Sequence, residues 1–283
     1  MIPIYTPDLK GILGGSGLFA DADYSNLNYT AENENGRDAH IHSFCEIYFN
    51  ISGDIAFAVE NNLYMVESGD IIITKPNEFH RCIYKNDCRH EHYCFWISAE
   101  ESFLPYLKSF YKRKNGERNH IKLNSDDAEL FKKNLNVLID NKGYGKFTDS
   151  ESLSALFSIL SIVDKNSSSF EEASLMPENF TKIVKHIDKN YSEDFSVTEI
   201  SEKYFISRSS LNRYFKQYLG TTPHKYVETR RLAAAKDMLE KGSQVLETAS
   251  KCGFPDYSHF ISLFKKRFGV TPHKYRKLYK SER

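Results

Sequence analysis

The sequence predicts an α+β protein: an antiparallel β-barrel or sandwich with two helices, followed by an all-α domain in which a linking helix joins two helix-turn-helix motifs. Three observations predict this fold class. Short β-rich runs occupy residues 40–97, helical periodicity occupies residues 178–283, and one segment near the C-terminus occurs twice. With 283 residues, of which 40% are apolar, the chain is long enough to bury two separate cores.

The β-rich part contains five strand-like runs, separated by Ser-Gly-Asp and Glu-Asn-Asn turns. The runs are residues 47–49, 55–59, 63–66, 71–73 and 93–97. Such short, evenly spaced runs predict a meandering antiparallel sandwich or barrel. The preceding residues 1–37 are polar, with a turn at Gly14–Gly17, and predict an arm with one or two strands.

Three histidines and one acid lie inside this part: His40, His42, Glu46 and His80. Their spacing resembles the two-motif core of the cupin superfamily of small jelly rolls. The first motif is complete, with His-x-His, a Glu four residues later and a Gly seven residues after that. The second motif departs from the family: Glu78 replaces its glycine, and His80 stands one residue early after Pro76.

Imidazoles and a carboxylate together suit Fe, Ni, Mn or Zn. Alternatively, the same groups hydrogen-bond one another and line a barrel that holds a ligand. Because the second motif is incomplete, we predict no metal and no cofactor, and we expect strand alternation to bring the four residues to one mouth. Aromatic faces beside a few polar groups suit a compact polar metabolite, such as a sugar. The predicted ligand site therefore comprises His40, His42, Glu46, His80, Tyr48 and Trp96.

A second group of potential ligands follows closely in the sequence: Cys82, Cys88, His90, His92 and Cys94. Alternation places the last three on one face of a strand. Their spacing fits no common zinc site, so a polar strand is the preferred interpretation.

Two amphipathic helices are predicted in residues 122–164. The first opens at Ser125, and the second begins at Asp149 or Ser150 after a break at Gly143–Gly145. These helices close the β core, form a dimer seam, or do both. The polar residues 165–177 predict a linker, so the expected domains are residues 1–164 and 178–283.

The repeated segment dominates the C-terminal part. Residues 211–226 return 49 positions later as residues 260–275, with Phe-Lys, Gly and Thr-Pro-His-Lys-Tyr in the same register. In each copy a glycine stands where a left-handed residue ends a helix, and Thr-Pro stands where the next helix begins. The glycines are Gly220 and Gly269, and the capping threonines are Thr222 and Thr271. The spacing predicts one supersecondary unit used twice.

Each copy completes a helix-turn-helix whose second helix has an apolar inner face and a polar outer face. Ser196 opens the first motif with a capping box, and Ser207 caps its second helix. After a linking helix over residues 226–241, Ser243 and Asp256 are the expected caps of the second motif. The inward residues are Leu211, Phe215, Leu219, Phe260, Phe264 and Phe268.

Charge separates the two parts of the chain. Residues 176–283 carry 21 Lys and Arg against 12 Asp and Glu, a net charge of +9, whereas the rest of the chain carries −9. A basic part predicts contact with a polyanion, although a solvated lysine-rich surface gives the same count. No run approaches the roughly 18 apolar residues that span a bilayer, and five scattered cysteines favour reduced thiols. We therefore expect a cytoplasmic protein that does not enter a membrane.

Further positions in residues 226–278 match a known signature: Arg231-Leu232, Ala235, Leu239, Ala249, Gly253-Phe254, Ser258, Phe260, Phe264-Lys265, Phe268-Gly269, Thr271-Pro272 and Tyr275-Arg276. They resemble the AraC/XylS family of bacterial transcription regulators over roughly residues 178–280. The cupin-like front part resembles the usual sensor domain of that family. The resemblance implies a non-enzymatic regulator, usually an activator, that binds double-stranded promoter DNA, RNA polymerase and a small-molecule effector as a homodimer.

The resemblance also places the residues that would contact DNA. On the first recognition helix, side-chain chemistry favours Asn212 and Arg213 for base contacts, with Arg208 and Ser209 near phosphates and Lys216 as a further outward-facing DNA-binding residue. On the second, the family's base-contacting positions fall on Tyr257, Ser258, His259, Ile261 and Ser262. Lys265 and Lys266 are expected to anchor phosphates there.

Two other functions fit parts of the sequence. A metal-dependent cupin enzyme with a DNA-binding tail is one, and metal content with turnover would identify it. A front domain that binds a partner protein is the other, and the polar His/Glu set argues against it.

Overall fold

The computed structural model describes residues 10–12, 18–29, 39–141, 150–168, 170 and 176–280. The chain forms two compact units, Met1–Leu175 and Met176–Arg283, called here the sensor unit and the helical unit. The expected turn at Gly14–Gly17, the break at Gly143–Gly145 and part of the linker over 165–177 lie outside the described residues.

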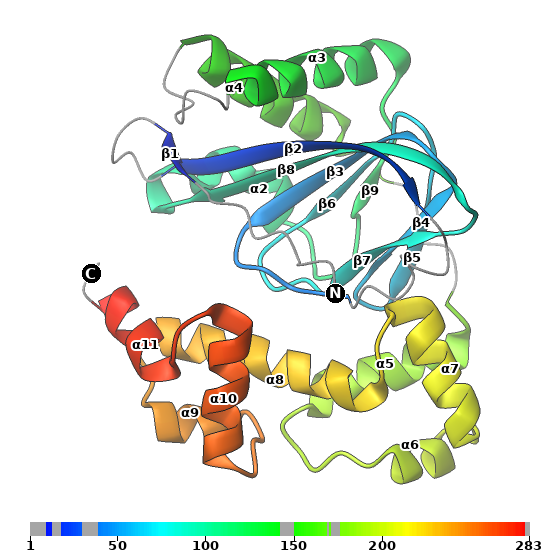
Figure 1. Cartoon of the computed structure of the whole chain (residues 1–283), viewed down its shortest axis with the longest axis vertical. Coiled ribbons are helices and arrows are strands. Elements are labelled where there is room, and N and C mark those ends of the chain that lie inside the picture. The colour runs from blue at the N-terminus through cyan, green and yellow to red at the C-terminus, as the bar shows by residue number, and fades with distance from the viewer. Residues whose placement is uncertain are drawn as a thin grey trace. The chain divides into compact units, whose positions relative to one another are not determined.

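The sensor unit contains two antiparallel sheets (Figure 1). Six strands in the order β1-β2-β8-β3-β6-β9 make the larger sheet, and β5-β4-β7 make the smaller one. The strands are β1 (Lys10–Ile12), β2 (Leu18–Tyr29), β3 (Cys45–Ser52), β4 (Ile55–Val59), β5 (Asn62–Val66), β6 (Ile71–Thr74), β7 (His80–Tyr84), β8 (Cys88–Ala99) and β9 (His120–Ile121).

Of the two predicted alternatives, the structure shows the sandwich rather than the barrel, and the predicted meandering strand order is wrong. No ladder between the named strands joins the two sheets within the described residues, so the strands form an open sandwich. The order is not sequential either, because β3 pairs with β6 and β8, and β8 also pairs with β2. Hydropathy places residues on a face, but only long-range hydrogen bonding selects the neighbouring strand.

Alternation along β3 divides its side chains between two cores. Cys45, Ile47 and Phe49 pack in the core that includes the helices α3 (Ser125–Asn141) and α4 (Ser150–Asn166). Tyr48 instead faces the smaller sheet and packs with residues of β4, β5 and β7. The two helices therefore close the β core, as one of the sequence alternatives predicts.

Several elements of the sensor unit carry no clear sequence signal. A 3-10 helix, Glu101–Leu107, runs into α2 (Lys108–Tyr111), β7 begins with two polar residues, and β9 has only two residues. β8 is also longer than the run 93–97 that predicts it, because its polar first half pairs with β2.

The helical unit contains the predicted pair of helix-turn-helix motifs (Figure 1). Its helices are α5 (Glu178–Asn190), α6 (Val197–Lys203), α7 (Arg208–Leu219), α8 (Pro223–Glu240), α9 (Val245–Lys251), α10 (Tyr257–Phe268) and α11 (Pro272–Lys280). Side chains of Ser196, Ser207, Thr222 and Asp256 cap α6, α7, α8 and α10 as expected. Gly220 (φ 64°) and Gly269 (φ 77°) are left-handed and end α7 and α10.

One expected cap is wrong. The N-cap of α9 is Gln244, and it makes no side-chain cap bond. Ser243 belongs to the turn that ends α8, where its N–H donates to Met238 O at 3.0 Å and Gly242 adopts a φ of 87°. Because Ser243 is held in that turn, Gln244 rather than Ser243 precedes the first residue of α9.

Polar contacts from three residues of the linking helix α8 hold it to α5 and its C-terminal end. Tyr226 Oη donates to Asp188 Oδ1 at 2.7 Å, and Arg230 Nε donates to the same oxygen at 2.8 Å. Arg231 Nε donates to Tyr191 O, just past the end of α5, at 2.7 Å. The signature arginine Arg231 therefore acts as a cap for α5, which is a structural role.

Candidate effector site and nucleic-acid interface

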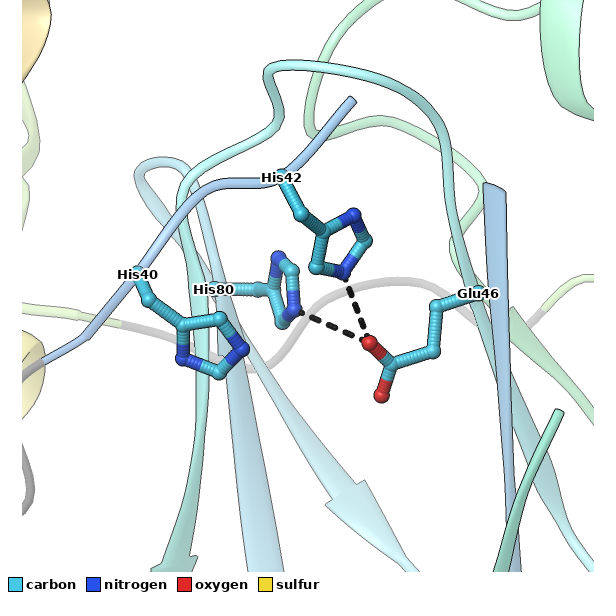
Figure 2. Close-up of side chains that lie close together, drawn as sticks. All are labelled: His40, His42, Glu46 and His80. Carbon is cyan, nitrogen blue, oxygen red and sulfur yellow. Dashed lines mark hydrogen bonds and ion pairs between the residues drawn. The ribbon is translucent and has the colours of Figure 1, made fainter. Parts of the chain in front are cut away.

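His40, His42, Glu46 and His80 converge at one place in the sensor unit (Figure 2). One ligand atom from each residue lies within 4.8 Å of the others. Glu46 belongs to β3 and His80 is the first residue of β7, so the site joins one strand from each sheet.

The predicted reason for this convergence is wrong. His40 and His42 precede β3 and do not continue its alternation. A pair of backbone hydrogen bonds brings His40 to the site instead: the amides of His40 and His80 each donate to the other's carbonyl at 3.0 Å.

Backbone carbonyls set the tautomers of two of the rings. His42 Nδ1 donates to Phe44 O at 2.9 Å, and His80 Nδ1 donates to Glu78 O at 2.8 Å. Because a carbonyl can only accept, each Nδ1 carries a proton. The two Nε2 atoms then face Glu46 Oε2, at 2.7 Å from His42 and 3.5 Å from His80.

The electrostatics of the site favour a negative Glu46. Burial pushes the pKa of Glu46 upward, but the hydrogen bonds and charges of His42 and His80 outweigh it and hold that pKa well below the usual value. Burial lowers the pKa of His42, against the opposing effect of Glu46. For His80, burial also lowers the pKa, but Glu46 outweighs it and the pKa is raised.

These donors fit a divalent transition-metal ion of the kind the cupin resemblance implies. Metal-binding histidines usually donate their second ring N–H to a carbonyl or carboxylate, as His42 and His80 do. Two Nε2 atoms that face one carboxylate oxygen also require a positive charge between them, either a proton or a metal ion. The four residues would hold such an ion, and it would supply a Lewis acid at this position.

The two aromatic residues of the predicted ligand site lie in different surroundings. Trp96 is opposite Glu46 in the β3–β8 register, so both side chains project from the same face. Tyr48 projects from that face as well, but its hydroxyl hydrogen-bonds to His90 and its ring lies 5.0 Å from that of Phe57. Tyr48 therefore belongs to the buried packing between the sheets, whereas Trp96 adjoins the cluster.

The polar first half of β8, which carries His90 and His92, is part of the packing between the sheets. The rings of His90 and His92 stack at 4.8 Å, and His92 also stacks on Tyr48 at 4.8 Å. Gly53 (φ 109°) lies so close that a Cβ there would be 2.3 Å from His90 Nδ1. Gly53, the glycine of the first cupin-like motif, thus leaves room for the ring of His90. The side chain of Cys88 lies outside the described residues.

Glu78, which departs from the cupin pattern, anchors a buried polar network that the sequence analysis missed. Its carboxylate is fully buried and receives both guanidinium Nη groups of Arg113, one at 2.7 Å. The amides of Lys75 and Gly116 and the side chain of Asn119 also donate to it. Because Glu78 O accepts from His80 Nδ1, this network also fixes the ring of His80. The sequence signal for this network is Glu78 itself, an acid where the cupin pattern has glycine. A buried acid at such a position requires a basic partner.

The predicted DNA-contacting residues lie at equivalent positions of two helices. Five positions of α7 recur on α10, 49 residues later, as the pairs Arg208/Tyr257, Ser209/Ser258, Asn212/Ile261, Arg213/Ser262 and Lys216/Lys265. All five on α7 are exposed. On α10, Tyr257 and Ile261 are half-buried, whereas Ser258, His259, Ser262, Lys265 and Lys266 are exposed.

Several of these side chains have partners within the helical unit, among them Ser209 with Ser207 and His259 with Glu228. Asn212 Nδ2 donates to Arg208 O at 2.8 Å, which leaves its carbonyl oxygen for another donor. Tyr257 Oη hydrogen-bonds to His273 Nε2 at 3.1 Å, so Tyr257 is held against α11. Arg213 lies with its guanidinium 5.6 Å from the ring of Tyr214, which is compatible with an extended, accessible fork.

Comparison with known proteins gives two matching family models. An AraC-like ligand binding domain matches residues 29–123, and a helix-turn-helix domain matches residues 200–278. The HTH-type transcriptional activator RhaS of Pectobacterium carotovorum is 25% identical over 81% of this chain and 84% of its own. The protein of the same name from Klebsiella pneumoniae is 26% identical, and the match spans 47% of this chain and about half (49%) of that relative.

A solved structure is also similar in sequence. It is a transcriptional regulator from Chromobacterium violaceum, described by its AraC-type DNA-binding domain. It is 33% identical and covers 36% of this chain and 91% of its own, with a TM-score of 0.34. No helix in the described part of the present chain is long and apolar enough to cross a membrane.

A small cupin-like domain followed by two helix-turn-helix motifs is the architecture of a DNA-binding transcription regulator with a ligand-binding domain. The two matching models together cover more than half of the chain. The chain belongs to the AraC/XylS family.

Proposed function

We propose that this protein regulates transcription by binding promoter DNA through α7 and α10, under the control of a small effector bound in the sensor unit. The observation that carries the proposal is the duplication: five outward positions, all exposed on α7 and three of them exposed on α10, recur on two helices that are each capped by a side chain after the turn of a helix-turn-helix motif. A helix of this kind fits the major groove, with its N-terminal turn near phosphates.

The two helices would read DNA unequally. Arg213 has the fork that binds guanine O6 and N7, and Asn212 has the amide that pairs with adenine. α10 offers Ser262, His259 and the methyl groups of Ile261, so its contribution to base discrimination is weaker. Lys265 and Lys266 would anchor it to phosphates. The interface thus reads sequence mainly through the first motif.

Activation, dimerisation and signal transmission are proposed from the names of similar proteins and from the surface of the sensor unit. The similar proteins are named transcriptional activators, which supports activation and contact with RNA polymerase. We infer a cytoplasmic homodimer in which the α3 and α4 helices transmit the effector signal. Dimerisation would use the outer surface of these helices, where Leu130 and Phe157 are exposed.

The effector site is proposed at the His40–His42–Glu46–His80 cluster beside Trp96. The interior between the sheets is filled by aromatic rings, including Tyr48, Phe57 and Tyr64, each at most 4% exposed. A compact polar metabolite with hydroxyl groups, such as a sugar, suits a site with three imidazoles, one carboxylate and an indole face. A thermal-shift screen of sugars and sugar acids, with Glu46→Gln as the matched control, would test this assignment.

Replacing Arg213 by alanine is expected to weaken specific DNA binding by about 1–3 kcal/mol and to relax one base position, because a bidentate base contact is lost. Lys265→Ala is expected to weaken binding to all DNA sequences to the same extent. Binding-site selection on both variants measures the difference. An unchanged preferred sequence in Arg213→Ala would contradict the assignment.

A bound transition-metal ion is the second candidate for the sensor, favoured by the orientation of the two Nε2 atoms. Our expectation remains that the metal is not obligatory. Exhaustive chelation should leave the unfolding temperature and the DNA affinity of the full chain unchanged, because apolar packing holds the two sheets. Calorimetry and elemental analysis before and after chelation check this. Stoichiometric metal that Glu46→Gln fails to retain, together with unfolding on its removal, would favour the metal-dependent alternative.

A further inference from the structure

Phe205 lies in the turn between α6 and α7 and is almost fully solvent-exposed, at 97%. Its backbone is also left-handed, with a φ of 52°. A bulky side chain rarely adopts this conformation, because its Cβ crowds the following carbonyl. Both its strain and its exposed apolar surface oppose folding stability.

The second motif contains the same turn with a glycine at the left-handed position. The amides of Tyr204, Phe205 and Ile206 donate to the carbonyls of Ile200, Glu202 and Ser201. The amides of Cys252, Gly253 and Phe254 repeat this pattern with Thr248, Ser250 and Ala249. Gly253 therefore occupies the position of Phe205, with a φ of 80°, and a Cβ there would also lie 2.3 Å from the carbonyl oxygen of Ser192. Glycine is the residue expected there, and the first motif has phenylalanine instead.

The position of Phe205 identifies its partner. It stands two residues before Ser207, the N-cap of α7, and three before the exposed Arg208. Exposed Lys203 flanks it on the other side. Two cations and the N-terminus of a recognition helix favour a phosphate backbone, and an aromatic ring among them would meet the sugars and base edges beside those phosphates.

We propose that Phe205 is a DNA-contacting residue that packs its ring on a deoxyribose and a thymine methyl at the edge of the major groove. Strained residues that folding does not explain are expected at functional sites. The contact rests on the proposed DNA binding by α7. It would give the first motif an apolar contact that the glycine of the second motif lacks.

The test uses the full chain and a duplex that the wild-type protein selects. Phe205→Gly is expected to weaken DNA binding about 10-fold, because the variant has no aromatic side chain to bury against the DNA. The slope of affinity against salt should not change, because no phosphate contact is removed. The unfolding temperature should rise, because the left-handed strain is relieved. Phe205→Tyr, which keeps the ring, is the matched control and should bind like the wild type.

The outcomes separate this proposal from the function on which it rests. If the wild-type protein selects no duplex, the DNA-binding proposal fails. If the wild type binds but Phe205→Gly binds equally well, Phe205 does not contact DNA. Equal DNA binding with lost activation would mean that the ring meets a protein, which also overturns the inference. A lower unfolding temperature in Phe205→Gly, and also in Phe205→Asn, would show that the ring packs within the chain.

Discussion

Replacing Arg113 by methionine is expected to lower the free energy of unfolding of the sensor unit by about 3–5 kcal/mol. The reason is the carboxylate of Glu78, which is fully buried and would lose its bidentate cation. Hydrogen bonds from the backbone amides of Lys75 and Gly116 and from the side chain of Asn119 would remain, but these donor groups are neutral and do not replace the guanidinium. Urea unfolding, followed with a probe specific to the sensor unit, measures the loss.

A double variant tests whether the stranded charge is the cause. Glu78→Leu combined with Arg113→Met removes both charges and should recover most of the lost stability. Arg113→Lys keeps the charge without the planar fork and should fall between the wild type and Arg113→Met. If Arg113→Met unfolds at the same urea concentration as the wild type, the network does not stabilise the sensor unit.

Raising the salt concentration from about 50 to 200 mM is expected to weaken binding to the selected duplex about 100-fold. This follows from neutralising about four phosphates, with a slope of about −0.9 for each, by Arg208, Lys216, Lys265 and Lys266. All four side chains are exposed. Binding titrations at several salt concentrations give the slope.

The same experiment tests where the binding resides. A fragment of residues 176–283, which carries the net charge of +9, should keep the salt slope of the whole chain. Lys265→Ala with Lys266→Ala should reduce the magnitude of the slope by about 2. If the folded fragment has no affinity for DNA at low salt, the assignment of DNA binding to the helical unit is wrong.

The helical unit shows how much local sequence determines. Caps at Ser207 and Asp256, left-handed glycines at Gly220 and Gly269, and the inward faces of α7 and α10 are all read from short segments. Helices depend on interactions within a few residues, so a repeated segment forms the same helix and the same turn twice. The one wrong cap, at Ser243, arose where two helix ends compete for the same residues.

The sensor unit shows what local sequence leaves undetermined. The strand runs and the His-x-His spacing are visible in the sequence, and the four site residues do lie together. Their meeting, however, depends on a bridge between His40 and His80, and on Glu78, Arg113 and Asn119, which lie far apart in the chain. Such long-range pairings have no periodic signal.

The sequence by itself therefore determined the α+β class, the duplicated helix-turn-helix domain, the family and the residues that meet at the sensor cluster. Only the tertiary structure decided that the β part is an open two-sheet sandwich, that Tyr48 is committed to packing with His90, and that Phe205 occupies a glycine position in full exposure. The physical reason is range. Helices, caps and turns are set by neighbours in sequence, whereas strand order, buried ion pairs and exposure are set by residues that meet only on folding.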